Sequence, residues 1–161
     1  MIKQGPIKRG KELVSLSREH HDGLLLCWKI NKGIENGVSM DRIKDYILFF
    51  FDENLEPHFE EEERYVFTLL PQEHPNRTEA EVHHKLIREL IDNFKSGKQT
   101  YPLSIKYFAE VLEMHIRYEE RVLFNIIEKE ANRQEIEITE AKLTSHPKCN
   151  AEWHDQFWAK K

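Results

Sequence analysis

Two stretches of the chain decide its fold: HFEEEERYVFTLL at residues 58–70 and HIRYEERVLFNII at residues 115–127. Each begins with a histidine that a glutamate follows four residues later, His58 with Glu62 and His115 with Glu119. On an α-helix this spacing places both side chains on one face, one turn apart. The apolar residues around them keep the same period, so we expect both pairs on buried faces. Continued past the glutamates, the period predicts these inward residues: Tyr65 or Val66, Leu69, Val122 and Ile126.

Helical periodicity extends through most of the chain. It predicts four long helices with short links between them, over about residues 10–35, 40–70, 78–97 and 100–131. Thr78–Glu81 has the pattern of a capping box that starts the third helix, and Pro57 is expected to bend the second helix or to open a turn in it. Asn132–Glu135 is expected to cap a shorter fifth helix ending near Thr144. Short links predict an all-α fold, an antiparallel up-down-up-down four-helix bundle.

Length and composition limit the classes of protein to consider. We expect a single domain over residues 1–161, with the bundle at 11–131 and a C-terminal helix and aromatic tail at 132–161. The net charge of −5 argues against a nucleic-acid partner. Apolar runs of about half a dozen residues are far shorter than the roughly 20 of a membrane span. The polar N-terminus resembles no signal peptide, and the two cysteines form no C-x-x-C pair, so we expect a cytoplasmic protein.

The first and third predicted helices each contain two adjacent histidines, His20 with His21 and His83 with His84. Adjacent positions on a helix lie about 100° apart, so only one of each pair can face the centre of the bundle. At that angle His20 and His83 fall in line with the apolar residues of their helices. We therefore predict His20 and His83 as the inward histidines, and a small helix rotation would exchange them for His21 and His84.

The predicted interior therefore holds six polar side chains in two halves: His20, His58 and Glu62 in one, and His83, His115 and Glu119 in the other. Two carboxylates and four imidazoles in an apolar core would lose hydration with little return. Metal cations would neutralise the carboxylates and accept the imidazole lone pairs. Mixed nitrogen and carboxylate oxygen donors suit iron, manganese or zinc rather than calcium. By contrast, we expect the neighbouring Glu60, Glu61 and Glu63 to form a solvated acidic face.

Four segments of the chain together resemble the hemerythrin-like (HHE cation-binding) family: SREHHDGLLLCW, PHFEEEERYVFTLLP, EVHHKLIRELI and MHIRYEERVLF. The resemblance covers about residues 11–131. It implies a non-haem di-iron centre, with manganese or zinc as substitutes. It also implies that Glu62 and Glu119 are bridging carboxylates and that the terminal ligands are His20, His58, His83 and His115.

The resemblance implies that the centre binds or senses oxygen or another small diatomic ligand. Oxygen-carrying hemerythrins have a fifth histidine four residues after the third-helix histidine. Here Ile87 follows His83 at that spacing, and Arg88 follows His84. This departure keeps other functions open: an enzyme acting on peroxide or nitric oxide, an iron-donating stress-repair protein, or a metal that only stabilises the fold. Candidates for the missing ligand are His74, Tyr65 and Tyr118.

The remaining notable residues lie mostly in the tail. Trp153, Phe157 and Trp158 are expected to dock on the bundle, with self-association through the aromatic tail as the alternative. A second metal site formed by His146, Cys149 and His154 is a weaker alternative, because their spacing matches no closed zinc pattern. Cys27 is expected to be a small core residue.

Overall fold

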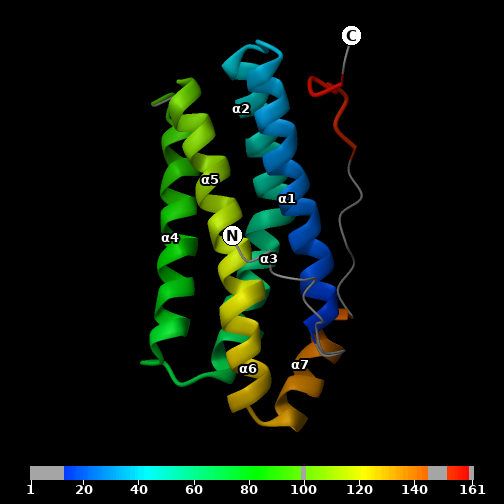
Figure 1. The fold of residues 1–161 in the computed structure, drawn as a ribbon, viewed down its shortest axis with the longest axis vertical. Helices are drawn as coiled ribbons and strands as arrows, with labels where there is room; N and C mark the ends of the chain where they lie inside the picture. Colours follow the sequence, from blue (N-terminus) through cyan, green and yellow to red (C-terminus); the bar gives the residue numbers. More distant parts are fainter. Residues whose placement is uncertain (1–12, 99–100, 145–151, 160–161) are drawn as a thin grey trace, which may run out of the picture.

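The computed structural model describes residues 13–98, 101–144 and 152–159. Its α-helices are α1 (Val14–Glu35), α2 (Met40–Phe50), α3 (Glu56–Glu61), α4 (Pro75–Lys95), α5 (Pro102–Tyr118), α6 (Phe124–Glu130) and α7 (Arg133–Thr144). Helices α2 and α3 continue into one another as a single long helix, and so do α5 and α6. The four long helices run up, down, up and down side by side, and α7 lies beside the lower end of α1 (Figure 1). The predicted all-α bundle is confirmed.

Three π-helical turns lie within the second and fourth long helices, at Phe51–Leu55, Glu62–Val66 and Glu119–Leu123. The amide of Phe67 donates to the carbonyl of Glu62, five residues earlier instead of four. The amide of Phe124 makes the same bond to Glu119. A π-turn therefore adds one residue to the helix and shifts the phase of everything after it. The first π-turn ends two residues before Pro57, which has no N–H to donate. The bend or turn expected at Pro57 is therefore a π-turn within a continuous helix.

The start of α4 differs from the prediction. The helix begins at Pro75 and not at the Thr78–Glu81 capping box. His74 is the N-cap, and its Nδ1 accepts a hydrogen bond from the amide of Asn76 at 3.2 Å. Proline suits the first helical position because its missing N–H is not needed there. The predicted stop at Gly97 is confirmed by its φ of 75°, a conformation that favours glycine after a helix.

The core consists of two apolar clusters separated by a polar layer. One cluster lies toward the α1–α2 connection and includes Leu26, Ile47, Ile87 and Phe108. The other lies toward α7 and includes Leu16, Val66, Phe124 and Ile127. Along each long helix, the inward histidines and glutamates lie at or next to the place where the residues of one cluster give way to those of the other. This arrangement places the polar groups deep inside the bundle, with apolar packing on both sides.

The tail docks on the bundle, as predicted. Phe157 is buried, and a Cβ at Gly33 would lie only 2.8 Å from its ring. The Trp153 ring lies 4.8 Å from that of Phe49, and Arg42 forms a two-pronged ion pair with Asp155 at 2.8 and 2.6 Å. The segment 152–159 is thereby fixed to α1 and α2 (Figure 1). Of the suggested tail metal site, His146 and Cys149 lie outside the described residues.

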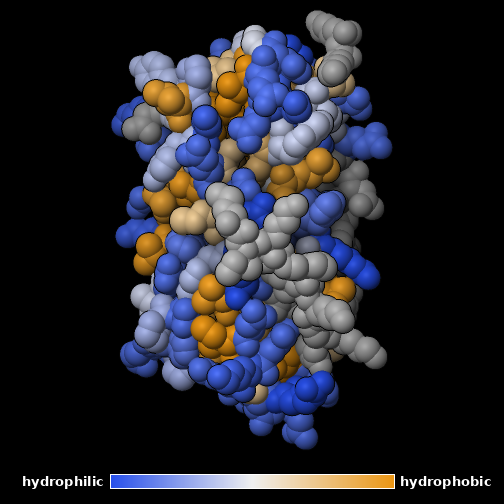
Figure 2. Space-filling view, viewed as in Figure 1, coloured by the Kyte–Doolittle hydropathy of each residue, from blue (hydrophilic) through white to orange (hydrophobic). Residues whose placement is uncertain are grey.

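The surface drawn in Figure 2 is mostly hydrophilic, with separate hydrophobic areas instead of one continuous band. Exposed large apolar residues occur on several helices, among them Trp28, Val82, Tyr107 and Ile138. Within residues 13–98, 101–144 and 152–159, no helix has the length and hydrophobicity that a membrane crossing requires.

Candidate metal centre

Among the described residues, six buried side chains of the polar layer form two groups. The first group consists of His20, His58, Glu62 and Glu119, and the second of Glu62, His84, His115 and Glu119. Within each group, the potential ligand atoms all lie within 4.8 Å of one another. Both carboxylates belong to both groups. Glu62, His84, His115 and Glu119 are completely inaccessible to solvent.

Each carboxylate turns one oxygen toward each group. Glu62 Oε1 lies 2.9 Å from His58 Nε2 in the first group, and its Oε2 lies 3.1 Å from His84 Nε2 in the second. Glu119 Oε2 lies 3.0 Å from His20 Nε2, and its Oε1 lies 3.4 Å from His115 Nε2. A carboxylate with one oxygen on each side is arranged to bridge two cations.

Most of these inner atoms have no hydrogen-bond partner. They are Nε2 of His58, His84 and His115, Oε2 of Glu62 and both carboxylate oxygens of Glu119. The imidazole nitrogens and carboxylate oxygens are close enough for hydrogen bonds, but they do not point at one another at the angles that a hydrogen bond requires. An unsatisfied buried polar group costs about 1–3 kcal/mol. A cation among these atoms would accept their lone pairs and remove that cost, so the donor set fits a metal.

Three carboxylates outside the centre hold the outer nitrogens of the imidazoles. His20 Nδ1 donates to Glu120 at 2.7 Å, His58 Nδ1 to Glu19 at 2.7 Å and His84 Nδ1 to Glu63 at 2.8 Å. Such a bond fixes the ring and leaves Nε2 as the atom that faces a metal. Two of these carboxylates are supported in turn, since Arg88 bonds to Glu63 at 2.6 Å and Ser17 donates to Glu120 at 2.8 Å.

The structure brings together five of the six predicted residues, and His84 stands where His83 was predicted. The His84 ring stacks on Phe59 with centroids 3.9 Å apart. His83 instead packs edge-on against Tyr118, and its Nδ1 lies 3.4 Å from Nδ1 of His115. His83 is therefore a contact of the fourth imidazole and not a member of either group. The choice of His20 over His21 agrees with the structure, because His21 is exposed.

The phase of α4 explains why His84 faces inward. The most deeply buried row of this helix is Ala80, His84, Ile87, Ile91 and Phe94. His83 lies on the flank of that row with Leu90, and the two residues are 8% and 7% exposed. The prediction set the phase from Ile87, Leu90 and Phe94 and gave no weight to Ala80. Ala80, a small apolar residue four positions before His84, was the feature of the sequence that indicated His84 as the inward histidine.

Burial and the neighbouring charges act in opposite directions on some of the buried groups and in the same direction on others. Burial lowers the pKa of His58, but the charge of Glu62 and the hydrogen bonds to Glu19 and Glu62 together outweigh it and raise the pKa to about 9. Burial, and next the charge of Glu62, raises the pKa of Glu119 to about 7. Burial and the neighbouring His84 lower the pKa of His115 well below its usual range, which keeps that imidazole neutral. Protons and a metal cation would compete for these atoms.

The residues considered as an additional ligand are engaged elsewhere. His74 Nε2 lies 3.1 Å from Glu130, and the Tyr118 hydroxyl donates to the backbone carbonyl of Asn76 at 3.2 Å. The Tyr65 ring lies under the Lys142 ammonium, 5.3 Å from its centroid. Cys27 is buried in the core as expected, and its thiol donates to the carbonyl of Ala109.

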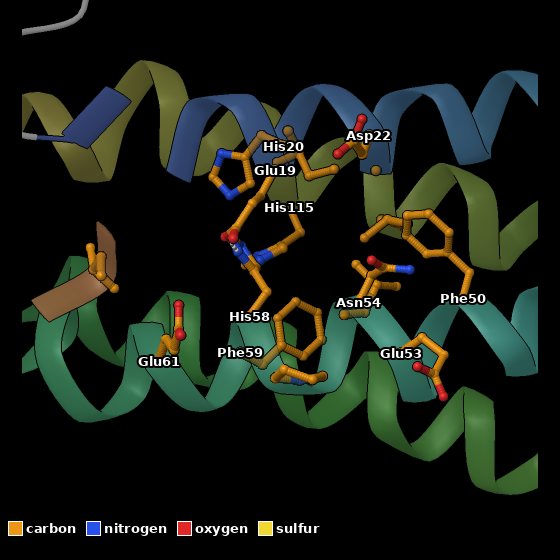
Figure 3. Close-up of a pocket in the computed structure, with 16 residues that line it drawn as sticks. Glu19, His20, Asp22, Phe50, Glu53, Asn54, His58, Phe59, Glu61 and His115 are labelled. Atoms are coloured by element: carbon orange, nitrogen blue, oxygen red, sulfur yellow. Dashed lines mark hydrogen bonds and ion pairs between the residues drawn. The ribbon is translucent and has the colours of Figure 1, made fainter. Parts of the chain in front are cut away.

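A cavity of about 320 Å³ reaches the centre from the surface between α1 and α3. Its inner end is lined by His20, His58 and His115, which lie close together in Figure 3. Apolar walls come from Phe50, Phe59, Leu112 and Ile116, and its outer part is lined by acidic residues. The centre is therefore buried within the bundle and still accessible to small molecules.

The comparison with known families agrees with this geometry. The model of the hemerythrin HHE cation binding domain matches residues 13–127, which covers the four long helices up to α6 and every residue of the two groups. No curated protein and no solved structure gives a significant match. The matched length and the two His/Glu groups lead to one conclusion: the chain belongs to the family of hemerythrin HHE cation-binding domains.

Proposed function

We propose that the protein holds a non-haem di-iron centre and binds or senses oxygen or another small diatomic ligand. The observation that supports two metals is that Glu62 and Glu119 each present one oxygen to each group of donors. A single metal would need an oxygen on only one side of each carboxylate. Histidine nitrogen combined with carboxylate oxygen suits iron, with manganese or zinc as substitutes.

In this proposal the protein side chains have separate roles. His20 and His58 would hold one metal and His84 and His115 the other, with Glu62 and Glu119 available to both. Glu19, Glu63 and Glu120 orient three of the imidazoles through their outer nitrogens. Phe59 and Leu112 form part of the apolar wall of the cavity beside the centre. When bound, ferrous iron supplies the electrons that reversible oxygen binding requires.

The chain has no histidine four residues after His84, and this supports a metal centre with coordination positions that the protein leaves open. Four residues after His84 stands Arg88, where oxygen carriers have their additional histidine. Its guanidinium pairs with Glu56 at 2.8 Å and Glu63 at 2.6 Å, so it supports the centre from outside. A metal with few protein ligands keeps positions for exogenous molecules.

A second candidate is an enzyme that acts on peroxide or nitric oxide. The size of the cavity favours it, because about 320 Å³ greatly exceeds what a diatomic molecule needs. A water molecule takes up about 30 Å³ in the liquid, so peroxide and several waters would fit together.

The test is to measure metal content and the response of the absorption spectrum to small ligands. We expect two irons per chain after anaerobic reconstitution, and a spectral change with oxygen or nitric oxide that reverses when the gas is removed. Catalytic loss of added peroxide would favour the enzyme. Glu62→Ala should lose metal, whereas Glu60→Ala, an exposed position in the same helix, should retain it. One iron or less per chain would overturn the di-iron proposal.

A further inference from the structure

The outer nitrogens of the four imidazoles in the centre are held in two different ways. Nδ1 of His20, His58 and His84 donates to a carboxylate, at 2.7, 2.7 and 2.8 Å. His115 differs from these three, because its Nδ1 lies 3.4 Å from Nδ1 of His83. The contact of His115 is therefore longer, and its partner is an imidazole instead of a carboxylate.

His83 can hold His115 only as a neutral acceptor. When Nε2 of His115 faces a metal, its Nδ1 carries the proton and donates it. Nδ1 of His83 then accepts through its lone pair, so the proton of His83 is on Nε2. The exposed carboxylate of Glu79 lies 3.8 Å from that Nε2, which is longer than a hydrogen bond. A negative charge therefore supports His115 only through a second imidazole.

This difference divides unevenly between the two groups of donors. In the first group, both His20 and His58 have a carboxylate acceptor, whereas in the second group His84 has one and His115 has none. Loss of an outer hydrogen-bond partner typically lowers metal affinity by about 10- to 100-fold. Such a carboxylate can have further partners and still accept, since the one that holds His84 is also paired with Arg88 at 2.6 Å.

The second group is also more deeply buried than the first. His84 and His115 are 0% exposed, whereas His20 is 3% and His58 6% exposed. The ring of Phe59 stacks on His84 with centroids 3.9 Å apart and meets His115 edge-on at 5.5 Å. A cation loses more hydration in such apolar surroundings. This observation is independent of the hydrogen bonds and also indicates weaker binding in the second group.

We propose that the two metal positions are unequal: the position with His20 and His58 binds a divalent cation more tightly and fills first, and His83 keeps the other position weaker. The inference rests on the proposed two-metal centre and adds an order of loading. One carboxylate acceptor fewer corresponds to about a tenfold lower affinity at the lower end of the known range. Because His83 acts through His115, it is a positioning residue.

The experiment follows zinc binding at each histidine of the centre. Metal-free protein labelled with ¹⁵N is titrated with zinc, and the Nε2 resonances of the histidines report which of them bind the metal. Competition with a chelator series measures the affinity for each zinc. In the wild type, the first equivalent should shift the resonances of His20 and His58, and the second those of His84 and His115. The second zinc should bind about tenfold more weakly than the first.

Two substitutions of His83 change mainly the charge of the acceptor. His83→Asp can place a carboxylate oxygen close to where Nδ1 lies, and His83→Asn can place a neutral amide oxygen there. We expect His83→Asp to bind the second zinc about tenfold more tightly than His83→Asn does, with the first zinc unaffected. Equal affinities of the two variants for the second zinc would overturn the role of His83.

The opposite change in the first group provides a measurement that leaves His83 intact. Glu19→Gln/Glu120→Gln replaces both carboxylate acceptors of that group with neutral amides. The order of filling should then reverse, so that His84 and His115 shift first. An unchanged order, or equal affinity of the wild type for both zincs, would overturn the inequality and leave the two-metal centre in place. Uptake of fewer than two zincs by the wild type would contradict the two-metal centre and the inference together.

Discussion

Removing His84 should weaken metal binding much more than removing His83. Zinc sites with four protein donors bind with about 10–16 kcal/mol, so one donor contributes about 3 kcal/mol, or roughly 100-fold in affinity. His84 is one of the four donors of the second group. His83 reaches the centre only through a long contact of 3.4 Å with His115. Loss of such an outer contact lowers metal affinity by about tenfold at the lower end of the known range.

The assay is competition with a chelator series, using His84→Ala, His83→Ala and wild-type protein reconstituted with the same metal. Circular dichroism of each variant checks that the bundle is retained, and His84→Gln repeats the test with less change in volume. We expect His84→Ala to lose metal to a chelator at least about ten times weaker than the one that strips His83→Ala. If His83→Ala loses metal as readily as His84→Ala or more so, the phase assigned to α4 is wrong.

Three further outcomes follow from contacts elsewhere in the structure. Glu63→Gln removes the anionic acceptor of the His84 Nδ1–H and should lower metal affinity about tenfold in the same chelator competition. Burial raises the pKa of Cys27 to about 12, so iodoacetamide at pH 8 should label this thiol only after unfolding in urea, as peptide mass mapping will show. Gly33→Ala should destabilise the protein by about 1–3 kcal/mol in urea unfolding, because the new Cβ would lie 2.8 Å from Phe157. Its cost should be smaller in a Phe157→Ala background.

Apolar periodicity was enough to predict the helices and the main members of the centre. The amides of Glu62 and Glu119 still bond to the carbonyls of His58 and His115, four residues earlier, just before each π-turn begins. A spacing of four in such an α-helical turn reliably places two side chains on one face. The same reasoning missed Glu63 and Glu120, since a run of acidic residues ordinarily indicates a solvated surface. Glu63 and Glu120 hold imidazoles that belong to other helices. The apolar period of one helix does not tell which residues of the other helices lie close to it.

Periodicity failed where the helix itself changes its period. Beyond the glutamates, regular α-geometry predicted Leu69, Val122 and Ile126 as inward residues. The structure buries the residue one position later in each case, Leu70, Leu123 and Ile127. The π-turns that begin at Glu62 and Glu119 each add one residue, which is the size of the shift. Tyr65 and Val66 were both considered, and Val66 is the buried one.

This explanation can be tested by removing the extra residue. Deleting the exposed Arg121 from the π-turn should restore an α-helix and leave Leu123 and Ile127 on the inward face. Deleting the exposed Asn125, which lies beyond the π-turn, should rotate Ile127 by about 100° away from the core. Loss of a buried isoleucine costs about 2–5 kcal/mol, so urea unfolding should find the second deletion less stable by about that amount. Equal destabilisation by the two deletions would show that the π-turn does not account for the shifted phase.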